Sequence, residues 1–132
     1  ANKLDAACAE CQRADPLRVM LQVNTSGEES KFGLPPGEAC LSLARHVVDA
    51  CPRLQLAGLM TIGQPDYTSE PENFLCLARC RDELCASLQL PKGSLELSMG
   101  MSGDFEQAIK MGSGNVRVGS TIFGAREYPN KK

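Results

Sequence analysis

The chain has 132 residues, 42% of them apolar, with a formal net charge of −2 and an isoelectric point near 5.4. That length suits one domain or part of one. The weakly acidic charge is unlike that of proteins that bind nucleic acid or anionic membranes, and no apolar run approaches the roughly 20 residues of a membrane span. We therefore expect no nucleic-acid or membrane partner. The sequence opens at Ala1 inside a helical pattern, so we expect a fragment.

Seven cysteines fall mostly within helical patterns, unlike those of a loop-rich secreted disulfide scaffold. Cys8 and Cys11 form a lone CxxC without the second pair that a zinc site needs. Free thiols in a reducing compartment are therefore the preferred interpretation, which favours the cytoplasm and also fits the mitochondrion. No metal site is expected.

Helix-like and strand-like segments alternate along the chain. The patterns predict helices over 3–13, 35–50, 72–88 and 104–111, with a short helical turn starting near Ser120. They predict strands over 18–23, 54–61, 95–99 and 115–118. Helical connections between consecutive strands require parallel strands and right-handed crossovers. Both a barrel and an open doubly wound sheet fit this α/β order.

The pattern within the strands favours the barrel. Parallel strands that are covered on both faces usually read as unbroken apolar runs. Here three of the four strands alternate; for example, Leu95, Leu97 and Met99 point one way while Glu96 and Ser98 point the other. The apolar face suits covering helices, and the polar face suits a barrel lumen that holds a ligand.

Two Gly/Ser-rich turns near the end of the chain form a candidate phosphate site. Ser102 follows one strand, and Gly119 and Ser120 follow the next, so the exposed N–H groups of both turns can meet at one anion. Arg117 lies between two valines and must point to the face opposite them. A buried guanidinium needs an acceptor, which a phosphorylated or heteroaromatic ligand would supply.

Four motifs carry a family resemblance. The chain resembles the C-terminal half of the pyridoxal phosphate homeostasis proteins, also called PLP-binding proteins or the YggS/PROSC family. The motifs that carry the resemblance are, in chain order, QVNTSGEESKFG, GLMTIG, LSMGMSGDFEQAI and NVRVGSTIFGAR. The resemblance implies the second half of a (β/α)8 TIM barrel of the alanine racemase N-terminal domain type, with four parallel strands and helices on one face. It assigns 1–126 to this barrel domain and leaves 127–132 as a polar tail.

The resemblance also implies a function. The family binds pyridoxal 5′-phosphate (PLP), has no established turnover, and is thought to buffer the cofactor and deliver it to PLP-dependent apo-enzymes. Ser102, Gly119 and Ser120 would hold the phosphate, and Arg117 would face the pyridine nitrogen. The pocket wall would be completed by Ser98, Met60 and Thr61. The family's Schiff-base lysine ends the first barrel strand, and none of the six lysines here takes such a place.

Other interpretations of the same residues stay open. Arg117 could pair with Glu96 on the lumen side, alone or together with a ligand, and Ser102 could simply cap the helix over 104–111. The loop over 25–31 could cover the pocket or be solvated. His46 is expected at a helix surface, without a catalytic role.

The sequence also leaves open a second function, and it predicts how an isolated half barrel should behave. The chain could come from an alanine-racemase-like PLP enzyme, although such racemases add a β-rich domain and residues 124–132 show no strand pattern. Full-length members of the family are expected to be monomeric. A half barrel has two open strand edges, so the isolated chain is expected to be marginally stable or to self-associate.

Overall fold

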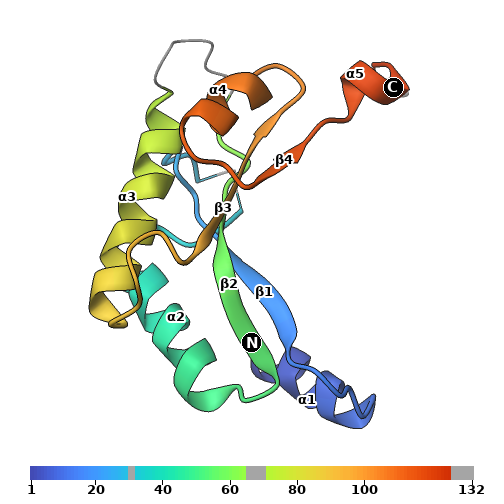
Figure 1. The fold of residues 1–132 in the computed structure, drawn as a ribbon, viewed down its shortest axis with the longest axis vertical. Helices are drawn as coiled ribbons and strands as arrows, with labels where there is room; N and C mark the ends of the chain where they lie inside the picture. The colour runs from blue at the N-terminus through green and yellow to red at the C-terminus, as the bar shows by residue number, and fades with distance from the viewer. Residues whose placement is uncertain (30–31, 65–70, 126–132) are drawn as a thin grey trace.

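Four parallel strands lie side by side in chain order, β1-β2-β3-β4, in one sheet (Figure 1). The computed structural model describes residues 1–29, 32–64 and 71–125. The strands are β1 (Leu17–Gln22), β2 (Leu54–Met60), β3 (Glu96–Met101) and β4 (Asn115–Arg117). The helices are α1 (Asn2–Glu10), α2 (Glu38–Ala50), α3 (Glu72–Ser87), α4 (Phe105–Lys110) and α5 (Ser120–Phe123).

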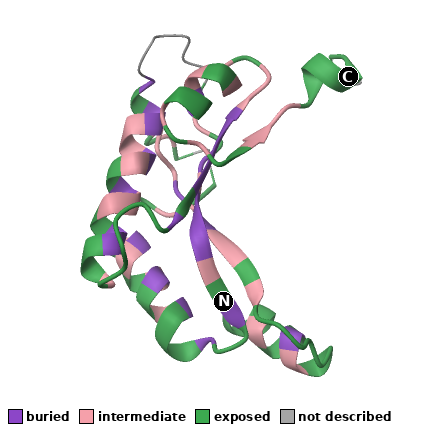
Figure 2. Ribbon diagram, in the orientation of Figure 1, coloured by how far each residue is buried: buried purple, intermediate pink, exposed green. Residues whose placement is uncertain are grey.

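The connecting helices α2, α3 and α4 cover one face of the sheet (Figure 1). Right-handed crossovers between strands in sequential order place every connecting helix on the same side. The buried core, purple in Figure 2, lies between these helices and the strands. Its largest members include Leu59, Leu97, Met99, Phe74 and Leu77, each at most 2% exposed. The opposite face of the sheet has no helix among the described residues.

Each predicted helix and strand is present, with ends displaced by at most three residues. The largest shifts are at the start of α2 and the end of α1, which ends at Glu10 because Gln12 takes a left-handed backbone conformation with a φ of 49°. Gly112, with a φ of 96°, follows the end of α4 as expected of a helix stop. The predicted polar tail over 127–132 lies outside the described residues.

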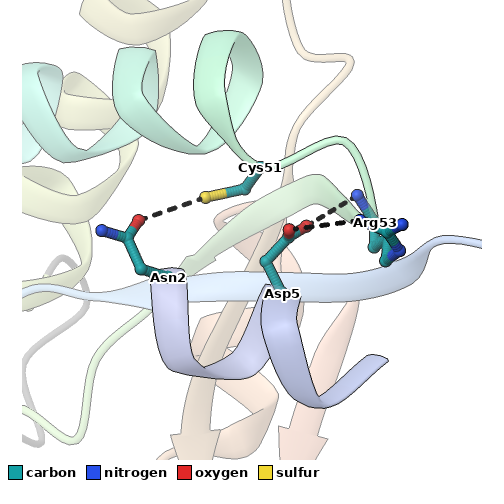
Figure 3. Close-up of polar contacts among 4 residues, drawn as sticks. All are labelled: Asn2, Asp5, Cys51 and Arg53. Carbon is teal, nitrogen blue, oxygen red and sulfur yellow. Dashed lines mark hydrogen bonds and ion pairs between the residues drawn. The ribbon is translucent and has the colours of Figure 1, made fainter. Parts of the chain in front are cut away.

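Helix α1 packs at the amino-terminal end of the strands through polar contacts (Figure 3). The Asp5 carboxylate accepts a hydrogen bond from the Arg53 amide at 2.7 Å and lies 3.7 Å from its guanidinium. Asn2 Oδ1 accepts from the Cys51 thiol at 3.8 Å and lies 2.5 Å from His46 Nε2. His46 therefore joins α2 to α1 at a half-buried position, in keeping with its predicted structural place.

All seven cysteines are free thiols, as predicted. Five are buried, and Cys40 and Cys80 lie where α2 packs against α3. Burial, reinforced by the neighbouring thiols of Cys76 and Cys40, raises the pKa of Cys80 to about 12. This thiol is therefore protonated at neutral pH and behaves as a small apolar core residue.

The strands β2 and β3 approach each other closely at Gly58. A Cβ at this position would lie 2.1 Å from the carbonyl oxygen of Glu96, its partner in the parallel register. The register between β1 and β2 also shifts beside this point, between Val19 and Met20. Only glycine fits without separating the two backbones.

We expect Gly58→Ala to lower the free energy of unfolding by about 1–3 kcal/mol, the usual cost of overpacking. Urea denaturation followed by far-ultraviolet circular dichroism measures this. The matched control is Gly114→Ala, whose added Cβ would meet nothing within 4 Å. Equal midpoints for the two variants would show that the strands can separate without cost.

Candidate functional site

The turns after β3 and β4 meet through the side chain of Ser102. Its Oγ accepts hydrogen bonds from the amides of Gly119 at 3.0 Å and Thr121 at 3.3 Å. The two turns are close because β3 and β4 are parallel neighbours whose carboxyl ends lie at the same edge of the sheet. The predicted convergence of the two turns is therefore present in the structure.

Ser102 does not cap α4, so that alternative is wrong. The residue before α4 is Asp104, whose carboxylate accepts from the Met101 amide at 2.7 Å instead of from the helix. Ser102 points away from α4 because its hydroxyl oxygen satisfies two amides at the start of α5. This serine links two strands rather than one strand and its own helix.

Arg117 lies on the sheet face opposite the helices. Its neighbour Val116 packs toward Ala108 and the helix side, and successive strand residues point to opposite faces. The guanidinium reaches across β3 to the end of β2, where Nη2 donates to the Thr61 carbonyl at 2.6 Å and Nη1 lies 3.4 Å from the Met60 sulfur. Its Nε–H is buried without a partner among the described residues.

The proposed ion pair between Arg117 and Glu96 is wrong. Glu96 instead pairs with Arg18 of β1, at 2.5 Å. Arg117 is in register with Met101, five residues further along β3 than Glu96. At about 3.3 Å per residue the backbone position opposite Arg117 is therefore roughly 16 Å along β3 from Glu96.

The predicted wall residues lie beside Arg117 and differ in what they present. Met60 contributes its sulfur and Thr61 its carbonyl oxygen, whereas the Thr61 side chain is buried toward the helix layer. Ser98 is 3% exposed and donates to Asn115 Oδ1 at 3.1 Å. Their role toward a ligand stays a prediction.

A surface hollow of about 300 Å³ lies at the junction of the two turns. This volume is at the lower end of the range for small-molecule sites, roughly 300–1,000 Å³. Four of the seven predicted site residues are among those that line it: Met101, Ser102, Gly103, Asp104, Arg117, Gly119 and Ser120. Asp104 contributes a negative charge, but one carboxylate oxygen is bonded to the Met101 amide.

The described part of the loop after β1 is held by hydrogen bonds to itself and to neighbouring elements. Asn24 Nδ2 donates to the Glu28 carbonyl at 2.8 Å, so the loop folds back on itself. Thr25 Oγ1 lies 2.8 Å from Thr61 Oγ1 and donates to Asn73 Oδ1 of α3 at 3.1 Å. Thr25 and Asn73 were not predicted as site residues, because their contacts join segments 36 and 48 residues apart, although Thr25 lies within the motif QVNTSGEESKFG.

The described lysines lie away from the carboxyl ends of the strands. Lys3 is in α1, Lys92 precedes β3, and Lys110 ends α4. Lys31, Lys131 and Lys132 lie outside the described residues. The described part of the chain therefore holds arginine, serine and amide donors at this edge of the sheet without a lysine.

Comparison with known proteins identifies the family. A family model described as "Alanine racemase, N-terminal domain" matches residues 1–127. The chain belongs to this family. The pyridoxal phosphate homeostasis protein of Homo sapiens is 47% identical over 99% of this chain and 48% of that protein. The protein of the same name from Caenorhabditis elegans is 48% identical over 88% of this chain and 48% of its own length. The resemblance stated from the motifs is thus confirmed.

Solved structures agree with the fold. An unknown protein from Bifidobacterium adolescentis superposes with a TM-score of 0.76 at 38% identity, over 92% of this chain and 48% of that one. PipY of Synechococcus elongatus with PLP bound gives a TM-score of 0.68 at 29% identity, over 93% of this chain and 55% of PipY. The predicted fold class, a parallel α/β sheet of the alanine racemase N-terminal domain type, is confirmed. The chain spans about half the length of these relatives.

Ser102→Ala should loosen the start of α5, because the amides of Gly119 and Thr121 lose their acceptor. One hydrogen bond contributes about 0.5–1.5 kcal/mol, so hydrogen exchange of these amides should rise roughly 2- to 12-fold. Amide exchange measured by NMR checks this, with Leu41 of α2 as an internal reference. In Ser102→Thr, which keeps the hydroxyl, these two amides should exchange at the rate of the parent chain. Faster amide exchange in both variants would mean that the hydroxyl is not the acceptor.

Proposed function

We propose that this chain binds pyridoxal 5′-phosphate and serves in intracellular PLP homeostasis, as a carrier of the cofactor. The observation that carries the proposal is the meeting of Ser102 with the Gly119 and Thr121 amides in a hollow that Arg117 also lines. The printed name of the human relative and the PLP-bound structure of PipY support the same ligand.

The donors at this site fit a phosphate. Ser102 Oγ accepts two N–H bonds, so its own proton is directed away from them and can be donated to an anion. Two donors that polarise a hydroxyl also strengthen the bond that it donates. Ser120 lines the same hollow, and the guanidinium of Arg117 adds a positive charge. Ser102, Gly119 and Ser120 would hold the phosphate and need no metal ion.

Arg117 fits the aromatic end of the ligand. Its two terminal nitrogens already have acceptors at the end of β2, whereas its buried Nε–H has none among the described residues. A ring nitrogen placed beside this donor would supply the missing acceptor. Met60 and Thr61 hold the guanidinium on this side of the sheet, and Ser98 completes the wall of the same pocket.

An arginine at the ring nitrogen favours a carrier over an enzyme. A guanidinium has a pKa above about 12 and does not give up its proton, so the ring nitrogen stays unprotonated. PLP supplies an electron sink for amine chemistry, and an unprotonated ring is a weak one. The family model, which carries the name of alanine racemase, favours the second candidate, a racemase-like PLP enzyme.

The compartment and the partners belong to the same proposal. Seven free thiols favour a reducing compartment, the cytoplasm or the mitochondrion. PLP-dependent apo-enzymes would receive the cofactor there. Among the described residues, no helix has both the length and the apolar composition to cross a membrane.

Binding of PLP by the chain, measured by equilibrium dialysis, tests the function. Ser102→Ala and Ser120→Ala should each weaken binding by about 1.5–3 kcal/mol, the contribution of a hydrogen bond to a charged group. Ser42→Ala, on the exposed surface of α2, is the control and should bind like the parent chain. Equal affinity in all four chains would remove the phosphate assignment, and turnover of L-alanine to D-alanine would favour the racemase candidate.

The sheet edges lead us to propose self-association of the isolated chain. Within the described residues β2 is the strand that pairs with β1 and β3 the strand that pairs with β4, so both outer strands have an edge that no strand covers; at the end of β1 the Leu34 amide donates to the Gln22 carbonyl. Next to β4, Ile122 is 66% exposed and Phe123 85% exposed, and Figure 1 shows α5 extending away from the sheet. Closure of a barrel would remove both edges.

Sedimentation velocity and calorimetry test this expectation on the 132-residue chain. We expect a concentration-dependent dimer, or a monomer with a broad and marginal thermal transition. Phe123→Ser should reduce association if α5 takes part in it, whereas Leu4→Ser in α1 is a comparison at the other end of the sheet. A sharp two-state transition of a strict monomer would contradict the proposal.

A further inference from the structure

A short chain of hydrogen bonds joins Thr61, Thr25 and Asn73 next to the carbonyl that Arg117 contacts. Thr25 donates its single hydroxyl proton to Asn73 Oδ1 at 3.1 Å. The 2.8 Å contact between the Thr25 and Thr61 hydroxyls must then use the proton of Thr61. The direction is therefore fixed, from Thr61 to Thr25 to Asn73. Thr61 is 1% exposed and Asn73 9% exposed, so water does not readily replace these partners.

This chain of bonds ends at the residue that holds the guanidinium. Thr61 directly follows β2, with its hydroxyl toward α3 and its carbonyl toward the opposite side of the sheet. The carbonyl accepts from Arg117 Nη2 at 2.6 Å, and the Thr61 amide donates to the Ser98 carbonyl at 3.1 Å. Side chain, amide and carbonyl of Thr61 are thus all bonded.

Arg117 depends on this acceptor more than an arginine in a long strand would. Its own strand, β4, has three residues and lies at the edge of the sheet. Its head group lies two strands away, at the end of β2. The orientation of the guanidinium is therefore set by the Thr61 carbonyl and not by the backbone that carries Arg117.

We propose that Thr25 and Asn73 are positioning residues for Arg117, which they orient through Thr61. This inference rests on the proposed function, because the benefit of the fixed orientation lies in PLP binding. A guanidinium that is already held in one orientation loses no further conformational entropy when it meets the ring nitrogen of PLP. Thr25 comes from the loop after β1 and Asn73 from the first turn of α3. The ends of β1, β2 and β4 are thereby tied into one unit around the ring end of the pocket.

The variants follow from the direction of the bonds. Thr25→Val keeps the shape of the side chain and removes both the acceptor for Thr61 and the donor to Asn73. Thr25→Ser keeps the hydroxyl and serves as the rescue. Asn73→Ala removes only the terminal acceptor and gives a second, milder perturbation should Thr25→Val fail to fold.

The first measurement needs no ligand. NMR of the Arg117 side chain, assigned with Arg117→Lys, reports rotation of the guanidinium about its Nε–Cζ bond. In the parent chain and in Thr25→Ser we expect resolved Nη1 and Nη2 resonances, because each nitrogen has a fixed acceptor. In Thr25→Val and Asn73→Ala we expect these resonances to merge. Resolved resonances in all four proteins would overturn the proposal.

The second measurement is the affinity for PLP. We expect the affinity to fall by about tenfold or more in Thr25→Val, the size of effect seen when the hydrogen-bond partners that orient metal ligands are removed. In Thr25→Ser we expect the affinity to change by less than about twofold. Unchanged affinity in Thr25→Val would overturn the positioning role. A parent chain that does not bind PLP would refute the proposed function, and the NMR result would still decide whether Thr25 and Asn73 orient Arg117.

Discussion

The site depends on one constraint, the parallel direction of neighbouring strands. Parallel strands in sequential order bring all their carboxyl ends to the same edge of the sheet. Ser102 and Gly119 are 17 residues apart, yet an amide–hydroxyl bond of 3.0 Å joins them. The same constraint places the end of β2 within reach of Arg117. An antiparallel arrangement of β3 and β4 would have put these two turns at opposite ends of the sheet.

The two faces of the sheet carry different kinds of residue. The helix side holds the apolar core, and even its cysteines act as apolar residues because burial keeps Cys80 protonated. The other face carries polar groups whose partners lie two strands away, such as Arg18 of β1 with Glu96 of β3 and Arg117 of β4 with Thr61 after β2. Arg18 pairs with a carboxylate and Arg117 with a carbonyl, and among the described residues the Nε–H of Arg117 is buried without a partner.

Sequence patterns were sufficient for the elements and for the nearness of the two turns. Alternating residues such as Leu95 to Met99 gave the strand faces, and a polar residue at each strand end indicated where the turns meet. The partners of the side chains were harder to foresee. The acceptor of Arg117 is the carbonyl of Thr61, and a backbone carbonyl leaves no signature in the sequence. Glu96 has the right charge and face for Arg117, but register places it beside Arg18.

The same limit applies to residues that act through others. Ser102 has the sequence context of a helix cap, because serine is among the residues preferred at the start of a helix. In the structure its hydroxyl oxygen instead accepts hydrogen bonds from two amides at the start of α5, not from amides at the start of α4. Asn73 belongs to none of the four motifs, Thr25 lies within one of them, and the importance of both comes from their hydrogen bonds beside the buried Thr61.

The electrostatics of the hollow favour a ligand with a negative and an aromatic end. Asp104 would repel a phosphate, but its carboxylate is bonded to the Met101 amide at 2.7 Å, which offsets part of its charge. Ser102, Ser120 and the cation Arg117 line the same hollow, whereas the amides of Gly119 and Thr121 already donate to Ser102 Oγ. An anion placed between the two turns would therefore meet hydroxyl donors and a positive charge. An aromatic ring extending from it toward β2 would reach the guanidinium, whose terminal nitrogens are already bonded and whose orientation is fixed before the ligand arrives.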